Sequence, residues 1–150
     1  VAKPKMQYAC HQKKIVLKGR KRGVYLVTAE IMAQARDLIQ SIRTGVCFLF
    51  LMHTSASLSI NENADPTVRE DMNAIMHSLV PDSSNYRHNY EGDDDMPAHA
   101  LSTLAGCSLT IPISGGTLAL GTWQGVYLLE YRHFGGDREI MVTVQGAAAK

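Results

Sequence analysis

The sequence predicts an α+β domain, in which an antiparallel β-sandwich packs against two to three helices. Alternating or continuously apolar segments indicate strands over most of the chain, and only three segments have helical spacing. The last third contains strand patterns alone, joined by glycine-containing turns. So few helices cannot cover both faces of a parallel sheet, which excludes a doubly wound fold.

Length and composition indicate one globular domain spanning residues 1–150. Hydrophobic residues make up 45% of the chain and charged residues 19%. The net charge of +1 gives no reason to expect binding to nucleic acid or to a membrane surface. The longest apolar run, residues 46–52, is too short to cross a bilayer. Three widely spaced cysteines and no visible signal peptide lead us to expect a cytoplasmic protein without disulfides.

Two helices are predicted in the first half of the chain. Thr28 is suited to cap the first, and Gly45 lies where a C-cap glycine is expected. Asp65 followed by proline begins the second, and Asp71 borders its apolar stripe. A third, short helix is expected to be capped by Asp95. The predicted strands are residues 6–18, 23–27, 46–52, 53–61, 108–113, 117–120, 125–133 and 138–145.

Residues 53–61 alternate regularly, which places polar side chains on one strand face. A polar strand face is often simply solvated. The functional interpretation is that it lines a pocket in which serine hydroxyls bind the oxygens of a phosphate or similar anion. The polar side chains of this face include His53, Ser55, Ser57 and Asn61.

Two acidic residues near this strand are candidate catalytic groups. Glu62 follows Asn61 at the strand end, and Asp71 lies on the next helix. Carboxylates are rarely buried unpaired, so Asp71 is either in a local salt bridge or orients or ligates something in a site.

Three histidines form a candidate metal site. His88 and His99 each have carboxylates close in sequence, an arrangement often found behind a metal-bound imidazole. If His53 approaches the same point, three imidazoles and an open position resemble a catalytic zinc site. The alternative is that each histidine has a separate structural role, because no compact metal motif joins them.

A glycine-rich block at residues 120–125 contains the only tryptophan, Trp123. Its ring is suited to the core, a pocket rim or a subunit interface. Farther along, Glu130 and Arg132 share a strand face, where they either form an ion pair or reach into a site. Arg132 is therefore a candidate anion-binding residue.

Three sequence blocks together resemble the YjbQ family. They are His53-Thr54-Ser55-Ala56 running into Ile60-Asn61-Glu62, then residues 93–99 (DDDMPAH), then residues 120–125 (LGTWQG). The resemblance covers about residues 12–146. It implies a jelly-roll-like sandwich that assembles as a homotrimer, with a polar pocket for a metal or a small anionic metabolite. It also makes His53, Asn61, Glu62, Asp71, His88 and His99 pocket candidates.

The family label associates its members with a secondary thiamine-phosphate synthase activity, which joins a pyrimidine diphosphate to a thiazole phosphate. Such a transferase must neutralise a departing pyrophosphate, for which enzymes commonly use magnesium on oxygen ligands. Three imidazoles instead favour zinc over magnesium as the divalent ion. Two alternatives therefore stay open: a metal-dependent hydrolase of a phosphorylated or carbonyl metabolite, with Glu62 or Asp71 as base, and a non-catalytic module that binds a small anionic metabolite.

Overall fold

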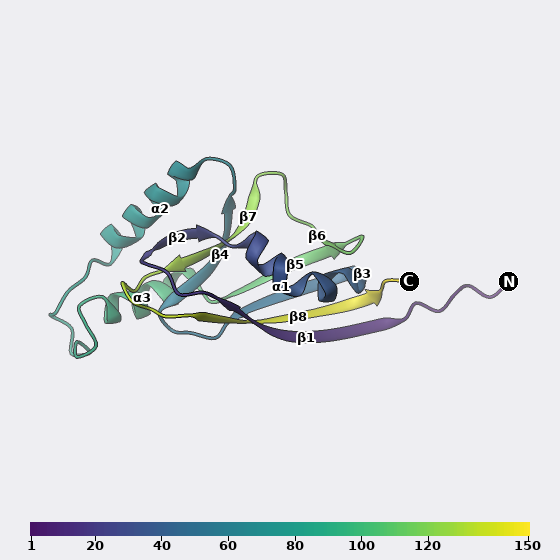
Figure 1. The fold of residues 1–150 in the computed structure, drawn as a ribbon, viewed down its shortest axis with the longest axis horizontal. Helices are drawn as coiled ribbons and strands as arrows, with labels where there is room; N and C mark the ends of the chain where they lie inside the picture. The colour runs from purple at the N-terminus through teal and green to yellow at the C-terminus, as the bar shows by residue number, and fades with distance from the viewer.

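The computed structural model describes residues 1–150 and contains two antiparallel sheets and three helices (Figure 1). This arrangement confirms the predicted α+β sandwich. The five-stranded sheet has the order β1 (Tyr8–Leu17), β8 (Arg138–Ala148), β3 (Ile42–Leu51), β5 (Ser108–Ser114) and β6 (Thr117–Leu118). The three-stranded sheet has the order β2 (Gly23–Leu26), β7 (Gln124–Glu130) and β4 (Ala56–Glu62). The helices are α1 (Thr28–Gln40), α2 (Pro66–Leu79) and α3 (Asp95–Ala105).

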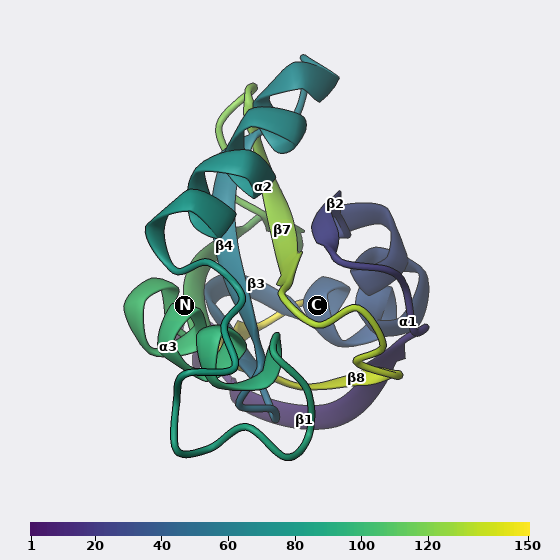
Figure 2. The same ribbon diagram turned by 90° about the vertical axis from the view of Figure 1, so that its left-hand side faces the viewer.

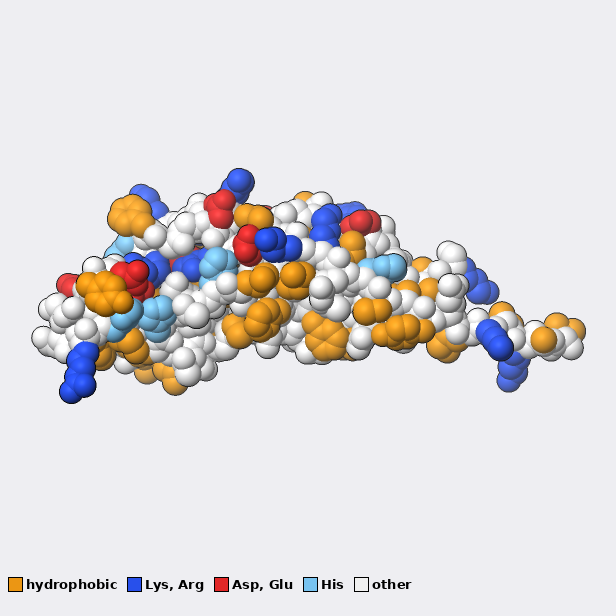
Figure 3. Space-filling view, turned by 90° about the horizontal axis from the view of Figure 1, so that it is seen from below, with side chains coloured by type: hydrophobic (Ala, Val, Ile, Leu, Met, Phe, Trp, Pro, Cys, Tyr) orange, Lys and Arg blue, Asp and Glu red, His pale blue; other side chains and the backbone are white.

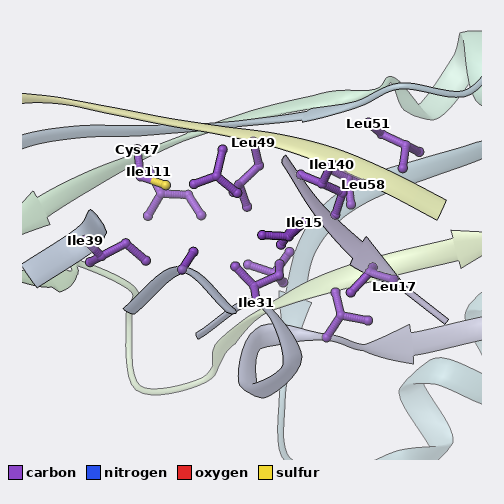
Figure 4. Close-up of a cluster of buried hydrophobic side chains, with 14 of the residues drawn as sticks. Ile15, Leu17, Ile31, Ile39, Cys47, Leu49, Leu51, Leu58, Ile111 and Ile140 are labelled. Carbon is purple, nitrogen blue, oxygen red and sulfur yellow. The ribbon is translucent and has the colours of Figure 1, made fainter. Parts of the chain in front are cut away.

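The main core is one cluster of 19 buried residues, contributed by both sheets and by α1. Alternation decides which side chains of β3 enter it: Cys47, Leu49 and Leu51 are buried, and the residues between them face outward. Ile31 and Ile39 bring the apolar face of α1 into the same cluster (Figure 4).

A second, smaller cluster lies between α3 and the other face of the three-stranded sheet. Ala98 and Leu101 of α3 pack there against Tyr127, Leu129 and Tyr131. β7 is consequently buried on both faces, and α3 is held firmly against β4 and β7 (Figure 2). This packing positions the residues of α3 described below.

The end of α1 differs from the prediction. The helix ends at Gln40, and β3 begins at Ile42, so Gly45 is a strand residue and not a helix cap. There β3 pairs with β8 so closely that a Cβ at Gly45 would stand 2.0 Å from the Gln145 carbonyl oxygen. Thr28 does not cap α1 either, because its hydroxyl accepts a hydrogen bond from Val126 N of β7 at 2.9 Å.

The predicted strand 53–61 is shorter than expected and is not a simple polar face. β4 begins at Ala56, and His53 lies in the connection from β3. Ser57 is fully buried, and its Oγ has no hydrogen-bond partner. The alternation failed as a guide because α3 covers the face that was expected to meet solvent.

The helix α2 begins as predicted but packs differently. Asp65 caps it, with Oδ1 accepting a hydrogen bond from Thr67 N at 2.9 Å. None of its residues is buried, and it projects from the body of the molecule (Figure 1). Asp71 is therefore exposed and does not border a buried stripe.

The remaining turns follow the sequence pattern. Gly115 and Gly116 have φ values of 58° and 75°, which is the left-handed backbone that a two-residue hairpin turn requires. Gly106 ends α3 as expected. No helix of the structure has both the length and the apolar character needed to cross a membrane.

Candidate metal centre

Three side chains converge at the start of α3. His99 lies one helical turn after Asp95, so both point to the same side of the helix, and His88 approaches them from the preceding loop. One potential ligand atom from each lies within 4.8 Å of the other two. Two imidazoles and one carboxylate at this spacing are a donor set suited to a transition-metal ion.

The hydrogen bonds of His99 determine which of its nitrogens is free. Its Nδ1 lies 2.8 Å from the carbonyl oxygen of Thr54, which can only accept, so Nδ1 carries the proton. In the neutral ring, Nε2 then presents a lone pair toward Asp95 Oδ1, 3.3 Å away. Two acceptors face each other, and a cation between them or a second proton on the ring relieves the repulsion. A backbone carbonyl behind the imidazole is also the usual support for a histidine that ligates a metal.

Asp95 is the buried member of this cluster, with 1% of its surface exposed. Its Oδ1 accepts a hydrogen bond from Arg132 Nη1 at 2.6 Å. Its Oδ2 lies 2.7 Å from His88 Nε2, within ion-pair distance, although the contact does not have hydrogen-bond geometry. A buried carboxylate oxygen is costly unless it is paired, and either a proton on His88 or a bound cation would satisfy this one.

Charge keeps Asp95 ionised in this position. Burial by itself would raise its pKa, but the positive charge of Arg132, together with His99, outweighs burial and holds the pKa below the ordinary value. The pKa of Asp94 is also below the ordinary value: burial raises it, but hydrogen bonds from His133 N and Arg132 lower it further than burial raises it. Both carboxylates are therefore negative at neutral pH, and Asp95 is the one that lies among the converging histidines.

The loop that carries His88 is tied down around the cluster. Arg132 Nη2 donates to the carbonyl of Glu91 at 2.9 Å, and His88 stacks edge-on against Tyr90 with the ring centroids 5.1 Å apart. At the start of the loop, Asp82 pairs with Arg22 at 2.8 Å. These contacts hold a loop that contains no helix or strand.

A cavity of about 550 Å³ opens beside the cluster. His99 lies in its wall, so a molecule in the cavity would be next to the converging ligand atoms. His53 lines it too, but its Nε2 accepts a hydrogen bond from Glu139 N at 2.8 Å and is not among the three converging groups. The other lining residues are Thr54, Ser102, Thr103, Gly106 and Cys107.

The residues predicted to bind an anion lie in other surroundings. Ser55 and Ser57 are buried and do not line the cavity. Arg132 does reach the cluster, but three of its five N–H donors bind Asp94, Asp95 and a backbone carbonyl. Its charge is balanced by the two carboxylates that it binds.

The residues predicted to be catalytic lie at the opposite end of β4. Asn61 and Glu62 are five and six residues beyond Ala56, which is about 17–20 Å at the usual rise of a strand. The Ser102 hydroxyl donates to the Ala56 carbonyl, so α3 and its histidine are at the near end. Asp71 is exposed on α2. Within one chain, none of the three meets the histidine cluster.

Sequence reasoning treated Asp95 as a helix cap and missed its place in the site. Asp94 occupies the cap position, and Asp95 is the first helical residue, with its carboxylate turned to the histidines. The spacing of Asp95 and His99 at i and i+4 was a usable signal, because such a pair shares a helix face. Ser102 and Thr103 carried no comparable signal.

The fold and the site define an α+β sandwich protein with a histidine–carboxylate cluster at the edge of a cavity. The family model for the UPF0047 protein YjbQ-like family matches residues 13–147, and the chain belongs to this family. It is 48% identical over 136 residues to UPF0047 protein YjbQ of Escherichia coli O157:H7, covering 91% of this chain and 98% of that protein.

Two solved structures have the same fold. An uncharacterised protein of the YjbQ/UPF0047 family from Clostridium acetobutylicum superposes with a TM-score of 0.76 at 34% identity, covering 88% of this chain and 98% of that one. A YbjQ-like protein of unknown function from Sulfolobus solfataricus superposes with a TM-score of 0.81 at 23% identity, over 93% and 99% of the two chains. At that identity, the second likeness supports the fold alone.

Proposed function

We propose that this protein is a metal-dependent enzyme that hydrolyses a small phosphorylated or carbonyl metabolite in the cavity beside α3. The observation that carries the proposal is the convergence of His88, Asp95 and His99, whose potential ligand atoms all lie within 4.8 Å of one another around a buried carboxylate.

The donor set favours zinc, or a similar transition metal, over magnesium. Imidazole nitrogens are common ligands of zinc and iron, whereas magnesium prefers oxygen ligands and keeps several waters. Three protein ligands leave positions open for substrate or water, as in catalytic zinc sites. When bound, such an ion polarises a substrate oxygen and lowers the pKa of water.

The protein groups have separable tasks in this proposal. Arg132 positions Asp95, and the Thr54 carbonyl orients the His99 ring. The carboxylate best placed to accept a proton beside the cluster is Glu91, whose Oε2 lies 3.7 Å from His88 Nε2. Glu62 and Asp71 would require a second copy of the chain to reach the same place.

Two other functions remain alternatives. Thiamine-phosphate synthase activity is suggested by the family label, and it requires room and charge for a departing pyrophosphate. A non-catalytic module for a small anionic metabolite would need the cavity but no metal. Each makes a different prediction about metal content and turnover.

Metal analysis of the purified protein tests the proposal first. We expect about one zinc or similar ion per chain, lost in His99→Ala and retained in His11→Ala, which alters an exposed histidine of β1 outside the cluster. Hydrolysis should then be measured with panels of esters, lactones and phosphate monoesters. A metal-free protein that binds phosphate tightly would support the binding module. Product formation from the two thiamine precursors, abolished in His99→Ala, would support the synthase.

We also propose that the protein forms a homotrimer. Trp123 is 65% exposed, although its loop is rigidly held: Asn63 Nδ2 donates to the carbonyls of Thr122 and Gln124, both at 3.1 Å. Hydrophobic side chains also gather on the outer face of the five-stranded sheet (Figure 3), where Phe50 of β3 is 50% exposed. Exposed apolar patches of this kind are typical of subunit contacts. Light scattering should give the mass of three chains, and a monomer at micromolar concentration would refute the trimer.

A further inference from the structure

The cavity beside α3 has an unusual charge distribution for a site that would hold a phosphate. None of its lining residues is a lysine, arginine, aspartate or glutamate. The nearby arginines are both committed: Arg132 binds Asp94 and Asp95, and Arg138 forms a two-bond ion pair with Glu130, with both distances 2.6 Å. A phosphorylated ligand would meet no free cationic side chain there.

His53 is fixed as a neutral hydrogen-bond donor in this cavity. Because its Nε2 accepts the backbone N–H of Glu139, the ring proton resides on Nδ1. Burial, together with the neighbouring charge of Arg138, lowers the pKa of His53, so the ring stays uncharged at neutral pH. Nδ1 has no hydrogen-bond partner in the protein and is not sealed from solvent, which leaves its N–H available to a ligand.

The two hydroxyls of α3 in the cavity wall act as hydrogen-bond acceptors, whereas His53 acts as a donor. Ser102 Oγ donates its only proton to the Ala56 carbonyl at 3.0 Å, and Thr103 Oγ1 donates to the His99 carbonyl at 3.1 Å. Toward the cavity they therefore act as acceptors. A phosphate dianion carries acceptors only, so it would be repelled by these oxygens, and no lysine or arginine of the wall would offset that repulsion.

We propose that the cavity takes an uncharged small molecule that presents a carbonyl oxygen to His53 and an O–H or N–H donor to Ser102 and Thr103. This inference rests on the proposed function, because it places the carbonyl beside the metal cluster. It narrows the proposed substrates from phosphorylated or carbonyl compounds to neutral carbonyl compounds, such as amides or lactones with a hydroxyl group. His53 then supplies a neutral N–H donor where negative charge develops on the carbonyl oxygen during hydrolysis.

Two matched probes test the charge preference. Glycolamide is neutral and has a carbonyl, a hydroxyl and an amide donor, whereas 2-phosphoglycolate is a multiply charged anion of similar size. Titration of the ¹⁵N-labelled protein with each should be followed at the backbone amides of Thr103 and Gly106. We expect saturable shifts with glycolamide and none with 2-phosphoglycolate. A tighter response to 2-phosphoglycolate, or no response to glycolamide at millimolar concentration, would overturn the inference.

Two variants test His53 directly. His53→Gln can still accept from Glu139 N and donate an N–H to the cavity, whereas His53→Leu can do neither. We expect His53→Leu to weaken glycolamide binding about tenfold, the change expected for one hydrogen bond, and His53→Gln to restore much of it. Equal affinity in both variants, with folding verified by their amide spectra, would remove His53 from the site.

Performing the titrations on zinc-loaded and metal-stripped protein separates this inference from the proposed function. If the protein cannot hold zinc but binds glycolamide in a way that depends on His53, the metal-dependent function is refuted and the inference about the ligand is supported. If the protein holds zinc but prefers 2-phosphoglycolate, the inference about a neutral ligand is refuted and the metal site of the proposed function is supported.

Discussion

Nη1 of Arg132 lies 2.6 Å from Oδ1 of Asp95, and the same guanidinium reaches Asp94 through Nε at 3.0 Å. One side chain from the segment after β7 thus orients the first residue of α3 and the residue before it. The contact places the carboxylate of the cluster although Arg132 itself has no atom among the proposed ligands.

Replacing this arginine should weaken the metal site without removing a ligand. Loss of a group that orients a ligand typically costs about 10–100-fold in metal affinity. We expect Arg132→Leu to show a loss of this size for zinc, measured by competition with a chelator, whereas Arg36→Leu on the exposed side of α1 should bind as the unaltered protein does. Unchanged affinity in Arg132→Leu would show that Asp95 is held in place by other contacts.

The buried pair of Glu130 and Arg138 should be essential for stability. Their side chains are 0% and 4% exposed, so removal of one partner leaves an uncompensated charge in the core. We expect Arg138→Met to lower the free energy of unfolding by about 3–5 kcal/mol in urea titrations. The double variant Glu130→Gln, Arg138→Met should recover part of this loss, and a double variant less stable than Arg138→Met would contradict the explanation.

Gly45 and Gly115 should respond differently to alanine. At Gly45 the added Cβ would meet the Gln145 carbonyl oxygen of β8 at 2.0 Å, which forces the two strands apart. Overpacking of this kind costs about 1–3 kcal/mol and occasionally more, and a clash with backbone belongs at the upper end of that range. At Gly115 nothing lies within 4 Å, and only the positive φ of 58° opposes a side chain, at about 1–2 kcal/mol. Thermal unfolding of both variants should rank Gly45→Ala as the less stable, and equal midpoints would argue against close contact of β3 and β8.

The stability of the metal-free protein should fall in mild acid. The pKa values of Asp94 and Asp95 are lower in the folded protein than the ordinary value of 3.8, so the folded state binds fewer protons than the unfolded chain. Their stabilisation is present above about pH 5 and is lost as the pH falls through the folded pKa values. Urea unfolding between about pH 6 and pH 3 should show this slope, and it should be shallower in Asp95→Asn. An identical slope in that variant would assign the acid sensitivity to other carboxylates.

Local patterns were reliable where one interaction decides the backbone. Asp65 caps α2 because its carboxylate can accept a hydrogen bond from a free N–H of the first turn and Pro66 is suited to the first helical position. Gly115 and Gly116 form their turn because only glycine adopts that backbone easily. The same reasoning failed for Gly45, because one sequence does not distinguish a glycine that ends a helix from a glycine that lets two paired strands approach closely. The prediction that Ser57 lies on a solvent-facing strand surface was also wrong, because the sequence of β4 does not indicate that α3 covers this residue.

The sequence by itself determined the antiparallel α+β class, the hairpin at residues 114–117 and the presence of imidazoles and carboxylates between residues 53 and 99. These follow from periodicity and residue chemistry, which act over a few neighbouring residues. Only the tertiary structure decided which groups meet: His88, Asp95 and His99 converge, His53 is committed to the backbone of β8, and Asn61 and Glu62 lie at the far end of β4. That choice depends on α3 packing against β4 and β7, a contact between segments distant in sequence.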